Sequence, residues 1–315
     1  MIGVPALAGM SGFCCPGKSM TDPITLTAGD WTAKIAPSIG GSLLSLTHKG
    51  ENILRQTPTE SIAAGDVRMT AGYPMVPYAN RIDHGRFVFD GVAHQLDTSF
   101  IGAPHSIHGV GWLRPWAVES EAARACTLAL HHQPSSPADA DWPFALEASL
   151  RFVLTPGRLT IRMSVTNLEP APAPAGLGFH TFFPRRLGET LAFRADGAWR
   201  NGPDMLPSTV ETGEAWNYVG GRALNSDEID NDFSGWGGLA RMSAPSGSVI
   251  RMRASRAFRV LRLYTPKDRD FYAVEPVTHL ANAINRPDVK EHAMTVLAPG
   301  ASLRGDIEIE LEAAA

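Results

Sequence analysis

Alternation of apolar and polar residues with a period of two is the feature that most limits the folds open to this chain. Residues 146–152 and 159–165 both alternate in this way, and Pro156-Gly157 lies between them. Period two is typical of half-buried β-strands and Pro-Gly is a turn signal, so the two segments predict a hairpin. Residues 87–89 before Asp90-Gly91 and residues 307–311 predict further strands.

Helical periodicity is weak, and no run of twelve or more residues is convincingly amphipathic. The 30 glycines and 24 prolines are spread along the chain and do not gather in one linker. These features predict an all-β fold, a large antiparallel β-sandwich that occupies residues 21–315 as a single domain. Residues 2–10 have no preceding cation and make a poor signal peptide. Residues 1–20 are therefore expected to be a disordered tail, or the true start is at Met20.

Charge and cysteine content exclude several classes of partner. The chain carries 28 basic and 32 acidic residues, a net charge of -4, with no basic block, so neither nucleic acid nor a membrane is expected as a partner. No apolar run reaches the roughly 18 residues that span a bilayer. Cys14, Cys15 and Cys126 fit neither a disulfide framework nor zinc spacing, which indicates a reducing compartment and a cytoplasmic protein without a metal site.

Three short segments rich in Gly, Pro or aromatic residues present a candidate acid–base set: His108, His180 and Glu275. A proton donor and a carboxylate on separate loops are the parts needed for acid–base chemistry on a polyhydroxylated ligand. Aromatic residues beside His180 favour a lowered pKa through desolvation. Each histidine could instead be a packed core residue. Glu275 precedes Pro276 and is expected at a strand end, where it could alternatively cap backbone amides.

Two further segments offer ligand-holding groups. Residues 72–82 contain two prolines, which argue against the interior of a regular strand, and they present Asn80 and Arg81. The guanidinium suits hydroxyl or carboxylate groups, although Arg81 could simply pair with a surface acid. Of Asp230 and Asp232, one could bind sugar hydroxyls while the other makes a local Asx-type turn, and spacing does not decide between them.

Together these segments resemble the aldose 1-epimerase (galactose mutarotase) family, in its bacterial, uncharacterised branch. The resemblance rests on residues 74–91, 107–116, 176–184, 230–237 and 264–277, in that order. It implies a mutarotase-like β-sandwich with a sugar in a cleft across one sheet, His180 as general acid and Glu275 as general base. It implies that Asn80, Arg81, His108 and Asp230 hold the sugar, with Asp230 preferred because it opens an Asp-x-x-Phe pattern. No cofactor is expected, and the oligomeric state stays open.

Three other functions remain open at this point. A glycoside hydrolase would use Asp230 and Glu275 as its two carboxylates. A non-catalytic sugar-binding module would need no matched acid and base. A sugar-phosphate mutarotase is suggested by Arg185-Arg186 next to the acid histidine segment.

Overall fold

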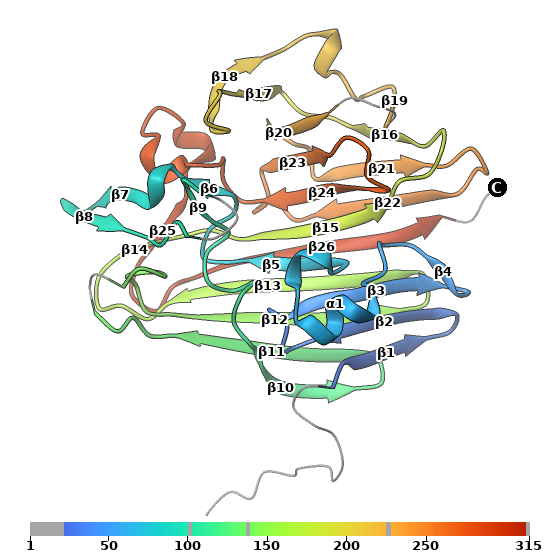
Figure 1. Cartoon of the computed structure of the whole chain (residues 1–315), viewed down its shortest axis with the longest axis horizontal. Helices are drawn as coiled ribbons and strands as arrows, with labels where there is room; N and C mark the ends of the chain where they lie inside the picture. Colours follow the sequence, from blue (N-terminus) through green and yellow to red (C-terminus); the bar gives the residue numbers. More distant parts are fainter. Residues whose placement is uncertain (1–21, 100–102, 137–138, 225–227, 313–315) are drawn as a thin grey trace, which may run out of the picture.

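The computed structural model describes residues 22–99, 103–136, 139–224 and 228–312 as an almost wholly antiparallel β-structure (Figure 1). The expectations for residues 1–20 lie outside the described residues. The helical elements of the described ranges are α1 (Thr59–Ala64) and short 3-10 turns at Val67–Met69, Asp83–Gly85, Glu214–Trp216, Ala283–Asn285 and Lys290–His292. All of them are far too short to cross a lipid bilayer.

Eleven strands among the described residues form the first sheet. In spatial order they are β1 (Ile24–Ala28), β2 (Trp31–Ala36), β3 (Ser42–His48), β5 (Gly72–Met75), β15 (Gly178–Pro184), β24 (Phe271–Val277), β23 (Val260–Thr265), β20 (Ile229–Ser234), β17 (Gly197–Asn201) and β18 (Pro207–Glu211), with β4 (Glu51–Asn52) paired to β3.

The second sheet has nine described strands. Their order is β10 (Ala117–Ala122), β11 (Ala125–His132), β12 (Leu146–Thr155), β13 (Arg158–Asn167), β26 (Ser302–Glu312), β22 (Val249–Ala254), β21 (Leu239–Ser243), β16 (Thr190–Phe193) and β19 (Arg222–Ala223).

Three two-stranded ribbons gather at one end of the sandwich, on the left in Figure 1. They are β6 (Arg81–Ile82) with β9 (Ser106–Ile107), β7 (Arg86–Phe89) with β8 (Val92–Gln95), and β14 (Ala173–Ala175) with β25 (Thr295–Leu297).

The predicted all-β antiparallel sandwich is confirmed, and its core lies between the two sheets. β12 and β13 pair as the predicted hairpin, and buried residues alternate with more exposed ones along both strands. Phe152 of β12 in the second sheet contacts Phe179 of β15 in the first, with ring centroids 6.4 Å apart. Apolar side chains of both sheets therefore form one buried cluster, and their removal from water is the main stabilising contribution to the fold.

β15 is buried on both faces, and this arrangement sets the position of the candidate site. Phe179 and Phe183 belong to the core between the sheets, whereas Phe182 belongs to a second apolar cluster on the outer face of the first sheet. His180 shares the outer face with Phe182, because alternate residues of a strand point to the same side. A polar residue is thus presented from the middle of a rigid sheet.

The argument from prolines against a strand at residues 72–82 is wrong for its first part. Pro74 lies inside β5 and pairs in register with Phe179. β5 has a continuous ladder only with β15, since β3 pairs with it at the single position Leu43↔Gly72. A proline is tolerated in a strand with one largely unpaired edge, as at the edge of a sheet.

Candidate active site

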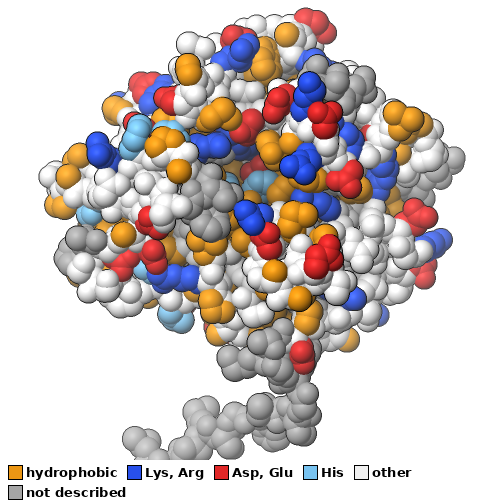
Figure 2. Space-filling view, in the orientation of Figure 1, with side chains coloured by type: hydrophobic (Ala, Val, Ile, Leu, Met, Phe, Trp, Pro, Cys, Tyr) orange, Lys and Arg blue, Asp and Glu red, His pale blue; other side chains and the backbone are white. Residues whose placement is uncertain are grey.

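A cleft of about 1100 Å³ opens on the outer face of the first sheet. Charged side chains surround a hollow near the centre of the face seen in Figure 2. All six residues predicted from the sequence to act on or hold a ligand line this cleft, namely Asn80, Arg81, His108, His180, Asp230 and Glu275. Side chains from segments distant in the sequence therefore converge on one cavity large enough for a small ligand.

A row of neighbouring side chains crosses the middle of the first sheet. In the ladder between β15 and β24, Gly178 pairs with Val277 and Thr181 with Val274, so His180 lies opposite Glu275. The neighbouring ladders extend this row in both directions. We call it the central row; its members in spatial order are Tyr73 (β5), His180 (β15), Glu275 (β24), Arg262 (β23) and Asp232 (β20). Directly opposed residues have their side chains about 5 Å apart on one face of the sheet.

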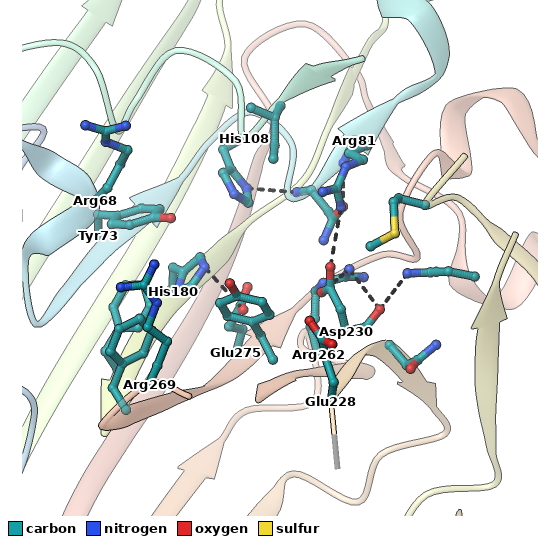
Figure 3. A pocket seen from close by; sticks show the side chains of 18 of the residues that line it. Arg68, Tyr73, Arg81, His108, His180, Glu228, Asp230, Arg262, Arg269 and Glu275 are labelled. Carbon is teal, nitrogen blue, oxygen red and sulfur yellow. Dashed lines mark hydrogen bonds and ion pairs between the residues drawn. The ribbon is translucent and has the colours of Figure 1, made fainter. Parts of the chain in front are cut away.

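His180 and Glu275 form a histidine–carboxylate pair in the cleft (Figure 3). His180 Nε2 lies 3.3 Å from Glu275 Oε1, and both residues are buried. Burial is the main cause that raises the pKa of Glu275 well above its usual value, and the nearby Arg262 opposes this rise. Burial likewise lowers the pKa of His180 well below 6.5, with the charges of His108, Arg55 and Arg262 acting in the same direction. Both shifts favour the neutral forms of the pair.

The second ring nitrogen of His180 adds to this preference. Nδ1 is buried and has no hydrogen-bond partner among the described residues. In an imidazolium this nitrogen would carry a proton that lacks an acceptor, which is unfavourable in a site shielded from water.

The expectation that Glu275 lies at a strand end is wrong. β24 continues through Pro276 to Val277, and Pro276 pairs in register with Leu261 of β23. A proline removes one backbone donor but is compatible with an extended backbone, so it does not end the strand here. Nor are the acid and the base on separate loops: each lies within a strand, where the sheet fixes its position.

Arg262 is a central member of the site that the sequence analysis did not single out. Its guanidinium is buried, donating to Asp230 Oδ1 at 2.5 Å and to Asp232 Oδ1 at 2.9 Å. Burial opposes the charge, but the two carboxylates raise the pKa of Arg262 above its usual value. The signal in the sequence is a single arginine inside the apolar segment Val-Leu-Arg-Leu of β23. A charged residue in such a segment must be paired when it is buried.

The two aspartates of β20 differ in position. Asp230 lines the cleft, and its Oδ2 lies 3.8 Å from Arg81 Nη1. Asp232 is 1% exposed, and its Oδ2 accepts a hydrogen bond from the backbone N–H of Ala281 at 3.0 Å. The expected Asx-type turn is therefore wrong for Asp232, because its carboxylate is used by Arg262 and by a distant segment of the chain.

Two hydrogen bonds, one of them to the His108 ring, link Asn80 and His108. The N–H of Asn80 donates to His108 Nδ1 at 3.1 Å, and the N–H of His108 donates to the carbonyl of Asn80 at 3.0 Å. Both residues have positive φ values, 62° and 63°, a conformation in which Asn and His are enriched and which clusters at functional sites. Since Nδ1 is an acceptor, the hydrogen of the neutral ring is on Nε2. Burial first, then Arg81 and Arg262, lower the pKa of His108 well below 6.5.

Among the buried aromatic residues near these segments, Phe182 lines the cleft, whereas Trp112, Trp116 and Trp236 do not. The ring of Phe182 stacks on His180 with centroids 4.3 Å apart. It therefore packs against one face of the imidazole.

A group of possible metal ligands lies outside the cleft, at Asp83, His84 and His105. His105 Nδ1 accepts from the backbone N–H of His84 at 3.0 Å, and its Nε2 lies 2.8 Å from the carbonyl oxygen of Asp204. Both nitrogens of His105 are thus engaged, so this cluster offers too few free ligands for a metal centre.

The large antiparallel sandwich with a polar cleft on one sheet defines a galactose mutarotase-like fold. The chain belongs to the aldose 1-epimerase family, whose sequence model matches residues 22–310. The resemblance seen in the sequence motifs is thereby confirmed at the level of the family.

Individual relatives agree with this assignment. An uncharacterised protein of Escherichia coli K12, YphB, is 27% identical over 250 residues, covering 76% of this chain and 83% of its own. The crystal structure of an aldose 1-epimerase candidate from Escherichia coli K12 is similar with a TM-score of 0.83 and 25% identity, covering 92% of this chain and 99% of that one. A galactose mutarotase-like protein from Clostridium acetobutylicum shares the fold with a TM-score of 0.81 and 21% identity, covering 91% and 94%.

Proposed function

We propose that this protein is an aldose 1-epimerase that interconverts the α and β anomers of a free aldose through acid–base ring opening and closure. The observation that supports this function most is the contact of 3.3 Å between His180 Nε2 and Glu275 Oε1 in a cleft lined by polar groups. Two titratable groups of opposite type then reach the two adjacent oxygens of one hemiacetal, the C1 hydroxyl and the ring oxygen.

The reaction needs two coordinated proton transfers. Glu275, as a carboxylate, takes the proton of the C1 hydroxyl while His180, as an imidazolium, donates a proton to the ring oxygen. The bond between C1 and the ring oxygen breaks, and an aldehyde forms at C1. Rotation about C1–C2 presents the other carbonyl face, and the same two groups then act in reverse to close the ring.

The electrostatics of the pair suit the open-chain intermediate. When the ring is open, His180 is neutral and Glu275 is protonated, which are the forms that burial favours. Arg262 supports the carboxylate form of Glu275 that ring opening needs, and the imidazolium form of His180 is paired with that carboxylate at 3.3 Å. Both states hold one proton between the two groups, so a full cycle takes no net proton from solvent.

Asn80, Arg81, His108 and Asp230 are assigned to sugar binding. His108 presents an Nε2–H donor, Asp230 an acceptor that Arg262 holds in place, and Arg81 a guanidinium. Alternating donors and acceptors match the hydroxyls of a pyranose. Arg262 acts as a positioning residue through its bonds to Asp230 and Asp232.

The rate accelerations expected from these groups are sufficient for this reaction without a metal or nucleotide. General acid and general base catalysis are each worth about 10²–10⁴-fold, and fixing the sugar between the two groups adds an orientation effect. Mutarotation already proceeds in water, so these contributions suffice.

Polarimetry of freshly dissolved α-D-glucose and α-D-galactose tests the function directly. The protein should accelerate the change of optical rotation towards the equilibrium value. Incubation with nitrophenyl glycosides separates this function from glycoside hydrolysis, because a mutarotase releases no aglycone. Aglycone release, or the absence of acceleration over a panel of aldohexoses, aldopentoses and their 6-phosphates, would contradict the proposal.

A further inference from the structure

The two sides of the cleft differ in how their positive charges are neutralised. On the Glu275 side, Arg262 and Arg81 face the carboxylate of Asp230. On the His180 side the lining includes Arg55, Arg68 and Arg269. Figure 3 shows Arg68 and Arg269 on the same side of the catalytic pair as His180, away from Asp230.

Arg55 is a buried cation without a carboxylate partner. It is 9% exposed, and no Asp or Glu of the described residues lies within ion-pair distance of it. Its Nη2 donates to the carbonyls of Arg68 at 2.8 Å and Thr70 at 2.5 Å, while its Nε is buried without a partner. Burial lowers the pKa of Arg55 to about 10, so it stays charged at neutral pH. An unpaired buried charge is unfavourable unless a ligand of opposite charge completes the site.

The neighbours of Arg55 do not supply that missing charge. Asp66 is held by Arg68, whose Nε and Nη2 each donate to it at 2.8 Å. Arg269 is exposed, and among the described residues no ion pair holds it. Asp270 attracts Arg55 from a distance without contacting it. This end of the cleft is therefore locally positive although the chain as a whole has a net charge of -4.

Arg55 lies near the catalytic pair, because the ring of Phe182 contacts both Arg55 and His180. Its guanidinium lies 3.7 Å from the centre of the Phe182 ring, and that ring is stacked on His180 at 4.3 Å. In a pyranose the ring oxygen is bonded to C1 and C5. With His180 at the ring oxygen and Glu275 at the C1 hydroxyl, the group on C5 must extend past His180, towards Arg55.

We propose that the substrate is an aldose with an anionic group, phosphate or carboxylate, at the exocyclic carbon attached to C5, and that Arg55, Arg68 and Arg269 bind this group. The inference rests on the proposed function for the placement of the sugar. The cleft volume of about 1100 Å³ leaves room for such a substituent beyond the pyranose ring. Guanidinium groups bind phosphate and carboxylate oxygens through paired hydrogen bonds.

The arginines that suggested a sugar phosphate in the sequence do not form this subsite. Arg185 donates to the backbone carbonyls of Pro266 and Phe271, and Arg186 donates to the carbonyl of Asn52 and to Glu189. Neither residue lines the cleft. Their closeness to His180 in the sequence is misleading, because both arginine side chains form hydrogen bonds with neighbouring segments outside the cleft.

The first experiment compares kcat/KM for anomer exchange of D-glucose, D-glucose 6-phosphate and D-glucuronate by NMR exchange spectroscopy. We expect at least one anionic sugar to exceed glucose by about tenfold or more, since hydrogen bonds to charged groups are stronger than neutral ones. The advantage should shrink as salt is raised, because screening weakens the partly exposed contacts to Arg68 and Arg269. The phosphate and carboxylate arms show which anion the subsite prefers.

Arginine variants then test which residues cause the preference for an anionic sugar. Arg55→Gln and Arg269→Gln should each lower the ratio of kcat/KM between the preferred anionic sugar and glucose, Arg55→Gln by about tenfold. Arg269 is exposed, so its variant keeps the test valid even if Arg55→Gln folds poorly. The matched control is Arg200→Gln, in β17 on the Asp230 side of the cleft, where Arg200 pairs with Glu211 at 3.6 Å. Its ratio should stay within about twofold of wild type.

A binding measurement separates this inference from the proposed function. 1,5-Anhydro-D-glucitol and its 6-phosphate cannot open their rings, so calorimetric titration reports recognition alone. Tighter binding of the phosphate that depends on Arg55 or Arg269, with no turnover of any aldose, would reject the epimerase and retain the subsite. Equal turnover of neutral and anionic sugars, or a ratio that Arg55→Gln and Arg269→Gln leave unchanged, would reject the subsite and retain the epimerase.

Discussion

Arg262 faces Glu275 across the ladder of β23 and β24, yet its hydrogen bonds go to Asp230 and Asp232 of the next strand. Glu275 therefore feels a fixed positive charge without being bonded to it, and its closest acid–base contact is His180. A carboxylate that acts as a base must be able to accept a proton. A direct salt bridge to arginine would hold it ionised and reduce its basicity.

The first prediction concerns the proposed catalytic pair, His180 and Glu275. Glu275→Gln and His180→Asn should each lower kcat/KM for mutarotation by about a hundredfold or more, because each removes one proton transfer. Polarimetry with α-D-galactose or the preferred sugar measures the effect. The second sheet offers a matched control in His131 and Glu147, an exposed pair with Nε2 and Oε2 3.1 Å apart. His131→Asn and Glu147→Gln should leave the rate within about twofold, and wild-type activity in either catalytic variant would overturn the assignment.

Stability should depend on pH through Glu275. Its pKa in the folded protein is raised above the unfolded value, so its favourable contribution is present at low pH and is lost as pH rises through the folded pKa. At about pH 8 Glu275→Gln should therefore have a free energy of unfolding higher than that of wild type by on the order of 1 kcal/mol, and a higher melting temperature, with a smaller difference near about pH 4.5. Thermal melts followed by circular dichroism test this. A variant that is less stable at the higher pH would contradict it.

His180 should make stability depend on pH in the opposite direction to Glu275. Its pKa is lowered in the folded protein, so its contribution is present above about pH 6.5 and is lost as pH falls through the folded value. Relative to wild type, His180→Asn should gain stability under acid conditions. Acid unfolding midpoints of the two proteins, measured at one temperature, provide the comparison, and an earlier acid transition in the variant would count against a buried neutral imidazole.

The two aspartates of β20 should separate stability from activity. Asp232→Asn removes a buried charge next to Arg262 and should lower the free energy of unfolding by about 3 kcal/mol. Asp230→Asn removes a cleft-lining acceptor and should raise KM and lower kcat, with a smaller loss of stability. Urea unfolding and steady-state kinetics on both variants test the distinction. Equal effects of the two substitutions on both measurements would show that the aspartates share one role.

His108 should act as a neutral donor. His108→Ala should raise KM about tenfold, and His108→Gln should recover part of the loss because its amide can donate from near the Nε2 position. Burial keeps the pKa of His108 low, so the ratio of wild-type to variant KM should not change between about pH 6.5 and 8. A ratio that rises towards acid pH would instead indicate an imidazolium.

The sequence contained enough to predict the fold class and six of the residues that line the cleft, but not their arrangement. Alternation in residues 146–167 shows strands, and the Gly-rich setting of His180 marks it for attention. What pairs His180 with Glu275 is the register of β15 against β24, and hydrophobic pattern alone does not specify which distant strands become neighbours.

Arg262 and Arg55 escaped prediction for a related reason. Each is one arginine next to apolar residues: Arg262 lies in β23, where in a half-buried strand such a residue usually points to solvent, and Arg55 follows β4 in a segment without regular structure. Only the folded chain shows that the outer face of the first sheet forms a cleft and that both arginines line it. Burial, and with it the need for a partner, is a property of the assembled sheet.

The central row lies in the middle of its strands, and this has a consequence for how such proteins can diversify. One residue inserted within β24 would turn Glu275 to the opposite face of the sheet, so the chemistry tolerates no change of length there. The rim of the cleft, including Arg68 and Arg269, is carried by the segments that connect the strands. New ligands can therefore be accommodated by replacing connecting segments while the central row in the interior of the sheet is inherited unchanged.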